Sequence, residues 1–180
     1  MDNTLKRKFH IDFGHSPDHS IDYLIGMLED TRITTLQAVR NIPVEQLHWQ
    51  YKEGWNTIGA LLAHLTALEH YFRIEFIEGR KLTQEENDHW LPALDMGKYL
   101  PQLINYQPIE VYITRLDQSR QLLFEALKKI TFEDFITRIE DYDPETGCNL
   151  AWVLYHMMED EIYHRGQMSM IRKLYKETVN

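Results

Sequence analysis

Residues 149–176 read NLAWVLYHMMEDEIYHRGQMSMIRKLYK and have the periodicity of one long helix. Steps of three and four along this segment mark one face, made of Val153, Met157, Asp160, His164, Gln167, Ile171 and Leu174. Apolar residues occupy both ends of the face, so we expect it to lie against the interior of a helical bundle. Its middle carries Asp160 and His164, which a purely structural face would not need.

Three further segments show the same periodicity. The first spans about residues 20–39, and the second begins after Trp55-Asn56-Thr57, where Asn56 or Thr57 can cap it, and stops near Gly79. The third follows Pro108 and extends to about residue 130. Residues 80–106 contain two prolines and a glycine, and we expect them to form a long connection without a long element. The sequence therefore predicts an all-α four-helix bundle with one long crossover between helices 2 and 3.

Length and composition limit the classes of protein. The 180 residues suit a single domain over residues 1–180, with residues 1–17 as a flexible N-terminal segment. The formal charge of −9 argues against nucleic acid as a partner. A lone Cys148 excludes an intrachain disulfide, and no secretory signal or run of roughly 20 apolar residues is present. We expect a cytoplasmic protein that does not enter a membrane.

The polar residues on the apolar face indicate a metal site. A carboxylate at the centre of a buried face is costly unless it is paired or coordinates a cation. Asp160 and His164 are one turn apart, roughly 5–6 Å at Cβ, and can converge on one ion. His64, on the apolar face of the second helix, is the candidate third ligand, although a buried histidine taken alone is more often a hydrogen-bonded core residue.

Two neighbours of these residues are candidates for supporting roles. His156 lies one turn before Asp160 and is either a further ligand or pocket residue, or a polar group facing water at the end of the bundle. Glu161 either hydrogen-bonds a ligand imidazole or solvates the outer face of the helix.

Two motifs resemble a known family. Residues 55–65, Trp-Asn-Thr-Ile-Gly-Ala-Leu-Leu-Ala-His-Leu, and residues 160–167, Asp-Glu-Ile-Tyr-His-Arg-Gly-Gln, are similar to those of the DinB/YfiT-like family. The resemblance covers about residues 20–175. It implies an up-up-down-down four-helix bundle, commonly dimeric, in which one histidine of the second helix and two of the fourth hold a divalent ion. His64 and His164 match two of those ligands.

The third ligand position departs from the family pattern, because Asp160 stands where the family usually has histidine. A set of two histidines and one carboxylate remains a competent metal site. The oxygen donor favours ions with mixed nitrogen and oxygen ligation, namely Zn, Ni, Fe or Mn. The alternative is that the substitution has abolished metal binding.

We predict a divalent-metal-dependent enzyme acting on a small molecule, in which three protein ligands leave positions open for water or substrate. The resemblance implies an S-transferase that uses a low-molecular-weight thiol such as bacillithiol, and a homodimer. Substrate is expected to enter beneath the 80–106 connection. The alternatives are a metal-dependent hydrolase and a non-catalytic, stress-related bundle whose metal is structural or absent.

Overall fold

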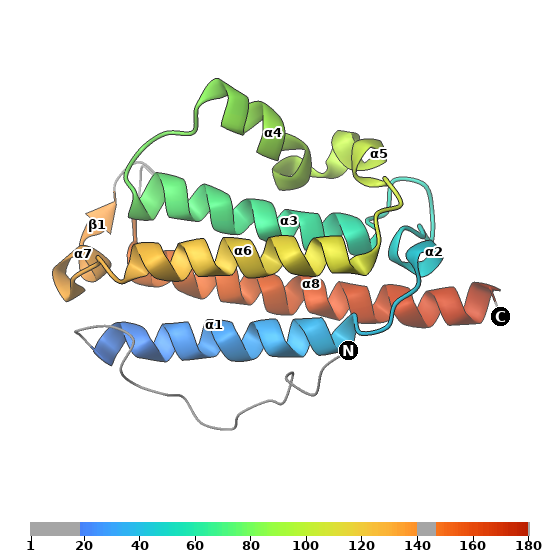
Figure 1. Ribbon diagram of the computed structural model, residues 1–180, viewed down its shortest axis with the longest axis horizontal. Coiled ribbons are helices and arrows are strands. Elements are labelled where there is room, and N and C mark those ends of the chain that lie inside the picture. The colour runs from blue at the N-terminus through green and yellow to red at the C-terminus, as the bar shows by residue number, and fades with distance from the viewer. Residues whose placement is uncertain (1–18, 140–146, 180) are drawn as a thin grey trace.

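The computed structural model describes residues 19–139 and 147–179, and the N-terminal segment predicted to be flexible, residues 1–17, lies outside them. Four long helices lie side by side in the described part of the chain (Figure 1). They are α1 (His19–Ala38), α3 (Ile58–Phe72), α6 (Ile109–Leu127) and α8 (Leu150–Val179). The predicted all-α bundle is confirmed.

Short elements connect these four helices. They are α2 (Val44–Leu47), the π-helix η1 (Arg73–Ile77), α4 (Gln84–Asp95), the 3₁₀ helix η2 (Gly97–Tyr99), α5 (Leu100–Leu103), α7 (Phe132–Ile136), and the antiparallel strands β1 (Arg138–Ile139) and β2 (Cys148–Asn149). No described helix has the length and apolarity that crossing a bilayer requires.

The helices run in the order up-down-down-up, so the up-up-down-down order implied by the family resemblance is wrong. Helices α1 and α8 are parallel, because Arg32 bonds Glu161 and, further along both helices, Arg172 bonds the carbonyl of Ala38. Helices α3 and α6 run together in the opposite direction (Figure 1). The short connection through α2 makes α3 antiparallel to α1. The long crossover brings the chain back to the end of the bundle where α3 began, so that α6 is parallel to α3.

Thr57 determines where α3 begins. Its backbone is extended and its hydroxyl accepts a hydrogen bond from the amide of Ala60 at 3.0 Å. Thr57 therefore satisfies one of the free amides of the first turn, which decides between the two predicted caps. At the other end, Gly79 has φ +66°, a conformation that glycine adopts without strain, and there the chain leaves the bundle.

The crossover contains more regular structure than the sequence predicted. Helix α4 has 12 residues and continues through Pro92, so the prediction that proline would prevent a long element here is wrong. A capping box formed by Thr83 and Glu86 starts the helix. Pro92 removes one amide donor and therefore one intrahelical hydrogen bond, and the helix continues for three residues beyond it. Helices α4 and α5 lie over α3, outside the four-helix bundle (Figure 1).

The core consists of two apolar clusters at opposite ends of the bundle. One includes Leu61, Leu65 and Leu116, and the other includes Leu28, Leu123 and Met157. Along each long helix, the residues between the two clusters include buried charged side chains. Asp160 and His164 lie between the two clusters on α8, whereas His64 lies on α3 between Leu62 and Leu65 of the first cluster.

Candidate metal centre

The structure brings together the three residues that the sequence predicted as metal ligands. His64 comes from α3, and Asp160 and His164 come from α8. One ligand atom from each lies within 4.8 Å of those of the other two. The Nε2 atom of His64 is 3.5 Å from Oδ2 of Asp160, and the Nε2 atom of His164 is 3.7 Å from Oδ1. Both imidazoles therefore present the same nitrogen to one carboxylate.

These side chains are shielded to different degrees. The two histidines are buried, whereas the side chain of Asp160 retains 22% of its exposure. The imidazole rings meet edge to face, with centroids 5.0 Å apart. The cluster is thus enclosed on the histidine side and reached from solvent on the aspartate side.

The backbone of α4 holds the ring of His64. Its Nδ1 atom lies 2.8 Å from the carbonyl oxygen of Ala93. Because α4 ends at Asp95, the carbonyls of its last turn have no following helical amide to accept from, and that of Ala93 is available to a side chain. A carbonyl only accepts, so Nδ1 carries the proton and Nε2 is left with a lone pair. This tautomer is the one that a metal ligand requires.

His164 has a comparable partner on its own helix. Its Nδ1 atom lies 3.3 Å from the side-chain oxygen of Gln167. Burial, reinforced by the nearby His64, lowers the pKa of His164, and Asp160 only partly offsets this effect. His164 is therefore neutral at pH 7, the form that binds metal.

Asp160 is ionised between the two rings. Burial by itself raises the pKa of this carboxyl, but the contact with His64 and the charges of His164 and His156 outweigh burial and lower the pKa. The site therefore offers one anionic oxygen donor, from Asp160, and one imidazole nitrogen from each of the two histidines.

His156 lies outside this cluster. Its Nδ1 atom is 3.4 Å from a carboxylate oxygen of Glu159, and its ring stacks on Trp152 at a centroid distance of 4.8 Å. His156 is half-buried in the N-terminal part of α8, and its ring also contacts Phe72. A role for His156 as pocket residue stays a prediction.

Glu161 faces the middle of the bundle. In the described part of the chain its carboxylate bonds Arg32, Arg120 and Thr35, and none of the hydrogen bonds found there joins it to a ligand imidazole. The contact with an imidazole that the sequence suggested is therefore absent. The alternative, solvation of the outer face, is wrong as well, because Glu161 is buried.

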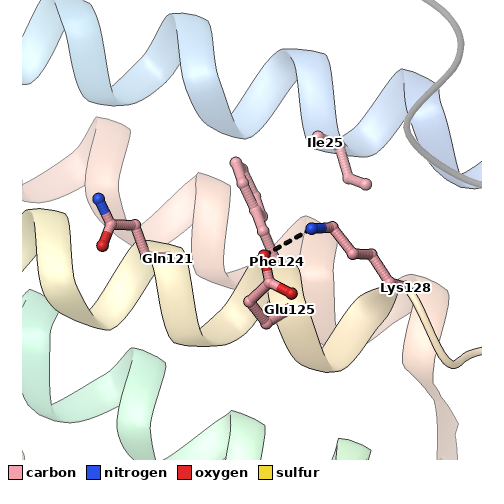
Figure 2. A pocket seen from close by; sticks show the side chains of 5 residues that line it. All are labelled: Ile25, Gln121, Phe124, Glu125 and Lys128. Atoms are coloured by element: carbon pink, nitrogen blue, oxygen red, sulfur yellow. Dashed lines mark hydrogen bonds and ion pairs between the residues drawn. The ribbon is translucent and has the colours of Figure 1, made fainter.

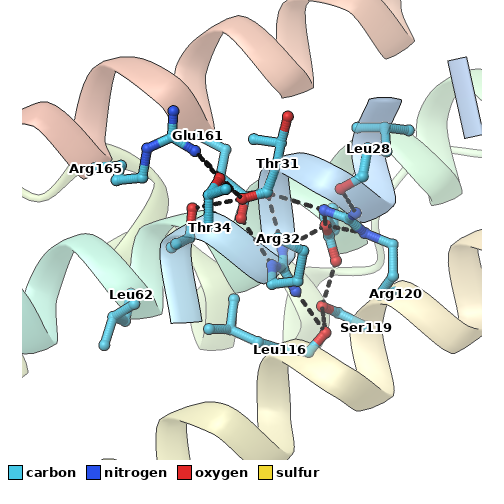
Figure 3. Close-up of polar contacts among 12 residues, drawn as sticks. Leu28, Thr31, Arg32, Thr34, Leu62, Leu116, Ser119, Arg120, Glu161 and Arg165 are labelled. Carbon is cyan, nitrogen blue, oxygen red and sulfur yellow. Dashed lines mark hydrogen bonds and ion pairs between the residues drawn. The ribbon is translucent and has the colours of Figure 1, made fainter. Parts of the chain in front are cut away.

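A closed ring of four charges, which the sequence alone did not predict, crosses the bundle, and one member, Glu161, directly follows Asp160. Figure 3 labels three of its members, Arg32, Arg120 and Glu161. Each long helix contributes one member, in the order Arg32, Glu161, Arg120 and Glu69. The four ion pairs of this charge ring measure 2.8, 2.9, 2.7 and 2.8 Å. All four side chains are buried, and two arginines against two glutamates leave no net charge.

Further hydrogen bonds satisfy the remaining polar atoms of the charge ring. Arg32 donates to the carbonyl of Leu116, Arg120 donates to that of Leu28, and Ser119 donates to Glu69. Buried ions need such complete pairing to offset their loss of hydration. Spacing marks each of the four residues as facing inward, because each lies four residues after an apolar core residue on its own helix, as Arg32 follows Leu28; spacing alone does not tell which of them pair.

Comparison with known proteins agrees with this geometry. The family model described as the DinB superfamily matches residues 27–168, which include the whole candidate centre. The chain belongs to the DinB superfamily. No curated protein matches it significantly.

The residues present in this DinB chain fit a divalent cation. Two imidazole nitrogens and one carboxylate converge, and the second nitrogen of each imidazole has its own hydrogen-bonding partner. Such outer partners orient the ligands of most protein metal sites. A cluster of this kind could hold a metal ion, and its donors are those of zinc and of the harder transition metals.

Proposed function

We propose that the protein is a divalent-metal-dependent enzyme acting on a small molecule, with His64, Asp160 and His164 as the metal ligands. One observation carries the proposal: both Nε2 atoms approach the Asp160 carboxylate while both Nδ1 atoms have other partners. A histidine pair retained only for packing would not need this common orientation.

The number and exposure of the ligands favour a catalytic over a structural ion. Structural zinc sites usually have four protein ligands, whereas catalytic sites have three and keep a position for water or substrate. A cation bound here would supply a Lewis acid that lowers the pKa of a bound water or thiol. Asp160 is the exposed member, so a small molecule would approach from its side.

The chain's own groups prepare this site. The Ala93 carbonyl and the Gln167 side chain hold the two rings, which reduces the reorganisation needed on binding. Asp160 supplies a negative charge close to both rings. The buried surroundings of His64 and His164 exclude bulk water and strengthen electrostatic interactions at the site.

The family resemblance supports thiol-dependent S-transfer as the reaction, with a low-molecular-weight thiol such as bacillithiol as the second substrate. Metal-dependent hydrolysis would use the same ligands and is the alternative reaction. A stress-related bundle with a structural ion, or none, is the non-catalytic alternative.

Metal content tests the first part of the proposal. We expect the purified protein to bind about one divalent ion per chain, and His64→Ala to reduce the bound metal strongly, because a site left with two ligands is weak. His89→Ala is the matched control, since His89 is exposed and outside the cluster. If the unaltered protein neither retains nor rebinds a divalent ion at micromolar concentration, as measured by elemental analysis, the proposal is wrong.

Activity assays on the metal-loaded protein separate the reactions. Conjugation of a small thiol to an electrophile should require the metal and should decline in Asp160→Ala. Hydrolysis of ester or amide probes without any thiol would favour the alternative reaction. Equal rates for Asp160→Ala and the unaltered protein would reject the role of Asp160 in either reaction.

We also propose that the protein is a homodimer that pairs through the exposed side of α8. An apolar stripe runs along this side, consisting of Trp152, Tyr155, Ile162, Tyr163 and Met170, all of which are exposed. Gly166 lies within the stripe, and a Cβ atom there would meet nothing. A glycine in the middle of a helix costs about 1 kcal/mol relative to alanine, and close approach of a second helix would explain its presence.

A further inference from the structure

A cavity of about 270 Å³ lies beneath the crossover, between α3, α4, α5 and α6. Its polar lining includes His89, Trp90, Gln102, Asn105, Tyr112 and Arg115. Pro92 and Ala93 form part of its wall, and the same Ala93 carries the carbonyl that holds His64. The cavity and the candidate metal centre therefore adjoin the same segment of α4, while none of the three metal-ligand candidates lines the cavity.

The charge of the cavity lining is opposite to that of the whole chain. The sequence has 28 acidic and 19 basic residues, yet no aspartate or glutamate lines this cavity. Arg115 is its one permanently charged side chain. Among the described residues, no hydrogen-bond or ion-pair partner is found for the Arg115 guanidinium. An unpaired guanidinium over a cavity without acids favours an anionic ligand.

Other hollows on the surface differ in this respect. The hollow of about 210 Å³ between α1 and α6 is lined by Glu125 and Lys128, and their ion pair of 2.5 Å satisfies both charges (Figure 2). Another, between η1 and α6, is lined by Arg73 and Glu78, which also pair with each other. In each of these two hollows, a basic side chain of the lining already forms an ion pair with an acidic side chain of the same lining.

Hydrogen bonds inside the cavity wall leave donors for a ligand. The side-chain oxygen of Asn105 accepts from the Tyr112 hydroxyl at 3.0 Å and from the amide of Gln107 at 3.2 Å. This fixes the amide orientation, and in the described part of the chain no partner is found for the Asn105 NH₂ group. Burial raises the pKa of Tyr112 to about 12, although Arg115 and Asn105 act in the opposite direction, so its hydroxyl stays a donor to Asn105.

Trp90 gives the cavity a firm aromatic wall. Its indole ring stacks on His70 with centroids 4.3 Å apart and an interplanar angle of 22°, and His89 meets it edge-on. These contacts hold the ring in place before any ligand arrives, which lowers the entropic cost of binding. An aromatic surface close to a guanidinium suits a planar body that carries a negative group.

We propose that this cavity is a binding site for a small planar organic carboxylate. Arg115 pairs with the carboxylate, the Asn105 NH₂ group donates a hydrogen bond, and Trp90 contacts the planar body. A single arginine matches the one charge of a carboxylate better than the two of a phosphate monoester. The inference goes beyond the proposed metal chemistry and does not require that a metal be bound.

Benzoate and its neutral analogue benzamide are suitable probes. Binding would be followed by NMR through the indole N–H resonance of Trp90, identified with Trp90→Phe. We expect saturable binding of benzoate and at least about tenfold weaker binding of benzamide, because only the carboxylate makes a charge-assisted contact. Arg115→Gln should weaken benzoate binding by about the same factor.

Arg40→Gln is the matched control, since Arg40 is also exposed but lies at the end of α1, away from the cavity. Its affinity for benzoate should equal that of the unaltered protein. Because Arg115 is exposed, its replacement should leave thermal unfolding unchanged, which separates lost binding from lost folding. The proposal is overturned if benzoate fails to saturate the Trp90 resonance, if benzamide binds equally well, or if Arg115→Gln and Arg40→Gln bind benzoate alike.

Discussion

Asp160 is the one carboxylate among the three candidate metal ligands. The sequence alone indicated that His64, Asp160 and His164 would meet, because polar residues on two apolar helix faces have few other partners. It could not indicate the Ala93 carbonyl, since any residue provides a carbonyl and only the end of α4 places this one beside His64. Ligand types were predictable, whereas the main-chain group that orients a ligand was not.

Asp160→His would give the site the three histidines that the family resemblance implies. Since carboxylate oxygen suits Mn²⁺ better than imidazole does, we expect the substitution to shift the affinity ratio towards Zn²⁺ by about tenfold or more. Competition between Zn²⁺ and Mn²⁺, followed with a chromophoric chelator, measures this ratio. Glu133→His is the control, because Glu133 is exposed on α7 and outside the cluster. An unchanged ratio in Asp160→His would mean that Asp160 does not contact the metal.

At the scale of elements, the charge ring fixes how the four long helices are turned against one another. Glu161 belongs to the charge ring and directly follows Asp160 on α8. The rotation of α8 that buries the Glu161 carboxylate in the ring therefore also turns the Asp160 carboxylate towards His64. Periodicity predicted the four helices but not these pairs, because pairing across a bundle depends on which helices are neighbours. That arrangement rests on the topology, which the sequence did not reveal.

Glu69→Gln removes one charge of the ring and keeps its shape. The partners Arg32 and Arg120 would then share a single carboxylate in a buried setting, and we expect the free energy of unfolding to fall by about 3–5 kcal/mol. Urea denaturation measures the loss. Glu110→Gln, an exposed change in the first turn of α6, should alter stability by less than about 1 kcal/mol. A loss as small as the control's would contradict the structural importance of the ring.

The start of α4 should be sensitive to acid. A hydrogen bond from Arg80, and then those from Thr83, lower the pKa of Glu86 from 4.5 to about 2. A lowered pKa in the folded state means that this carboxylate stabilises the helix above pH 4.5 and that the contribution is lost as the pH falls from 4.5 towards 2. The protection factors of the α4 amides, in which the intrinsic pH dependence of hydrogen exchange is divided out, should therefore fall across this interval. In Glu86→Ala, which has no side-chain acceptor for the Thr83 amide, the protection factors should be low already at pH 5, and an unchanged acid profile in this variant would disprove the role of the cap.

At the scale of the whole molecule, connection lengths explain what could be predicted. Helical periodicity and the presence of one long connection were sufficient to predict the four-helix bundle and its crossover. The family resemblance gave a wrong order of directions, and reasoning from connections corrects it: the short link after α1 forces an antiparallel neighbour, and the crossover makes α3 and α6 parallel. The contents of the crossover were underestimated, because proline was treated as a barrier although it is tolerated near the end of α4.

The proposed homodimer leads to a matched pair of substitutions. Ile162 on the α8 stripe and Leu122 on α6 are 44% and 47% exposed, so a lysine at either position is equally accessible in a single chain. If two copies pair through α8, Ile162→Lys would bury a charge in the interface and shift the protein to monomers, whereas Leu122→Lys would leave the dimer intact. Light scattering during size-exclusion chromatography gives the mass of each. A monomeric unaltered protein at tens of micromolar, or two variants of equal mass, would show that the α8 stripe is not the dimer interface, and Gly166 would then need another explanation.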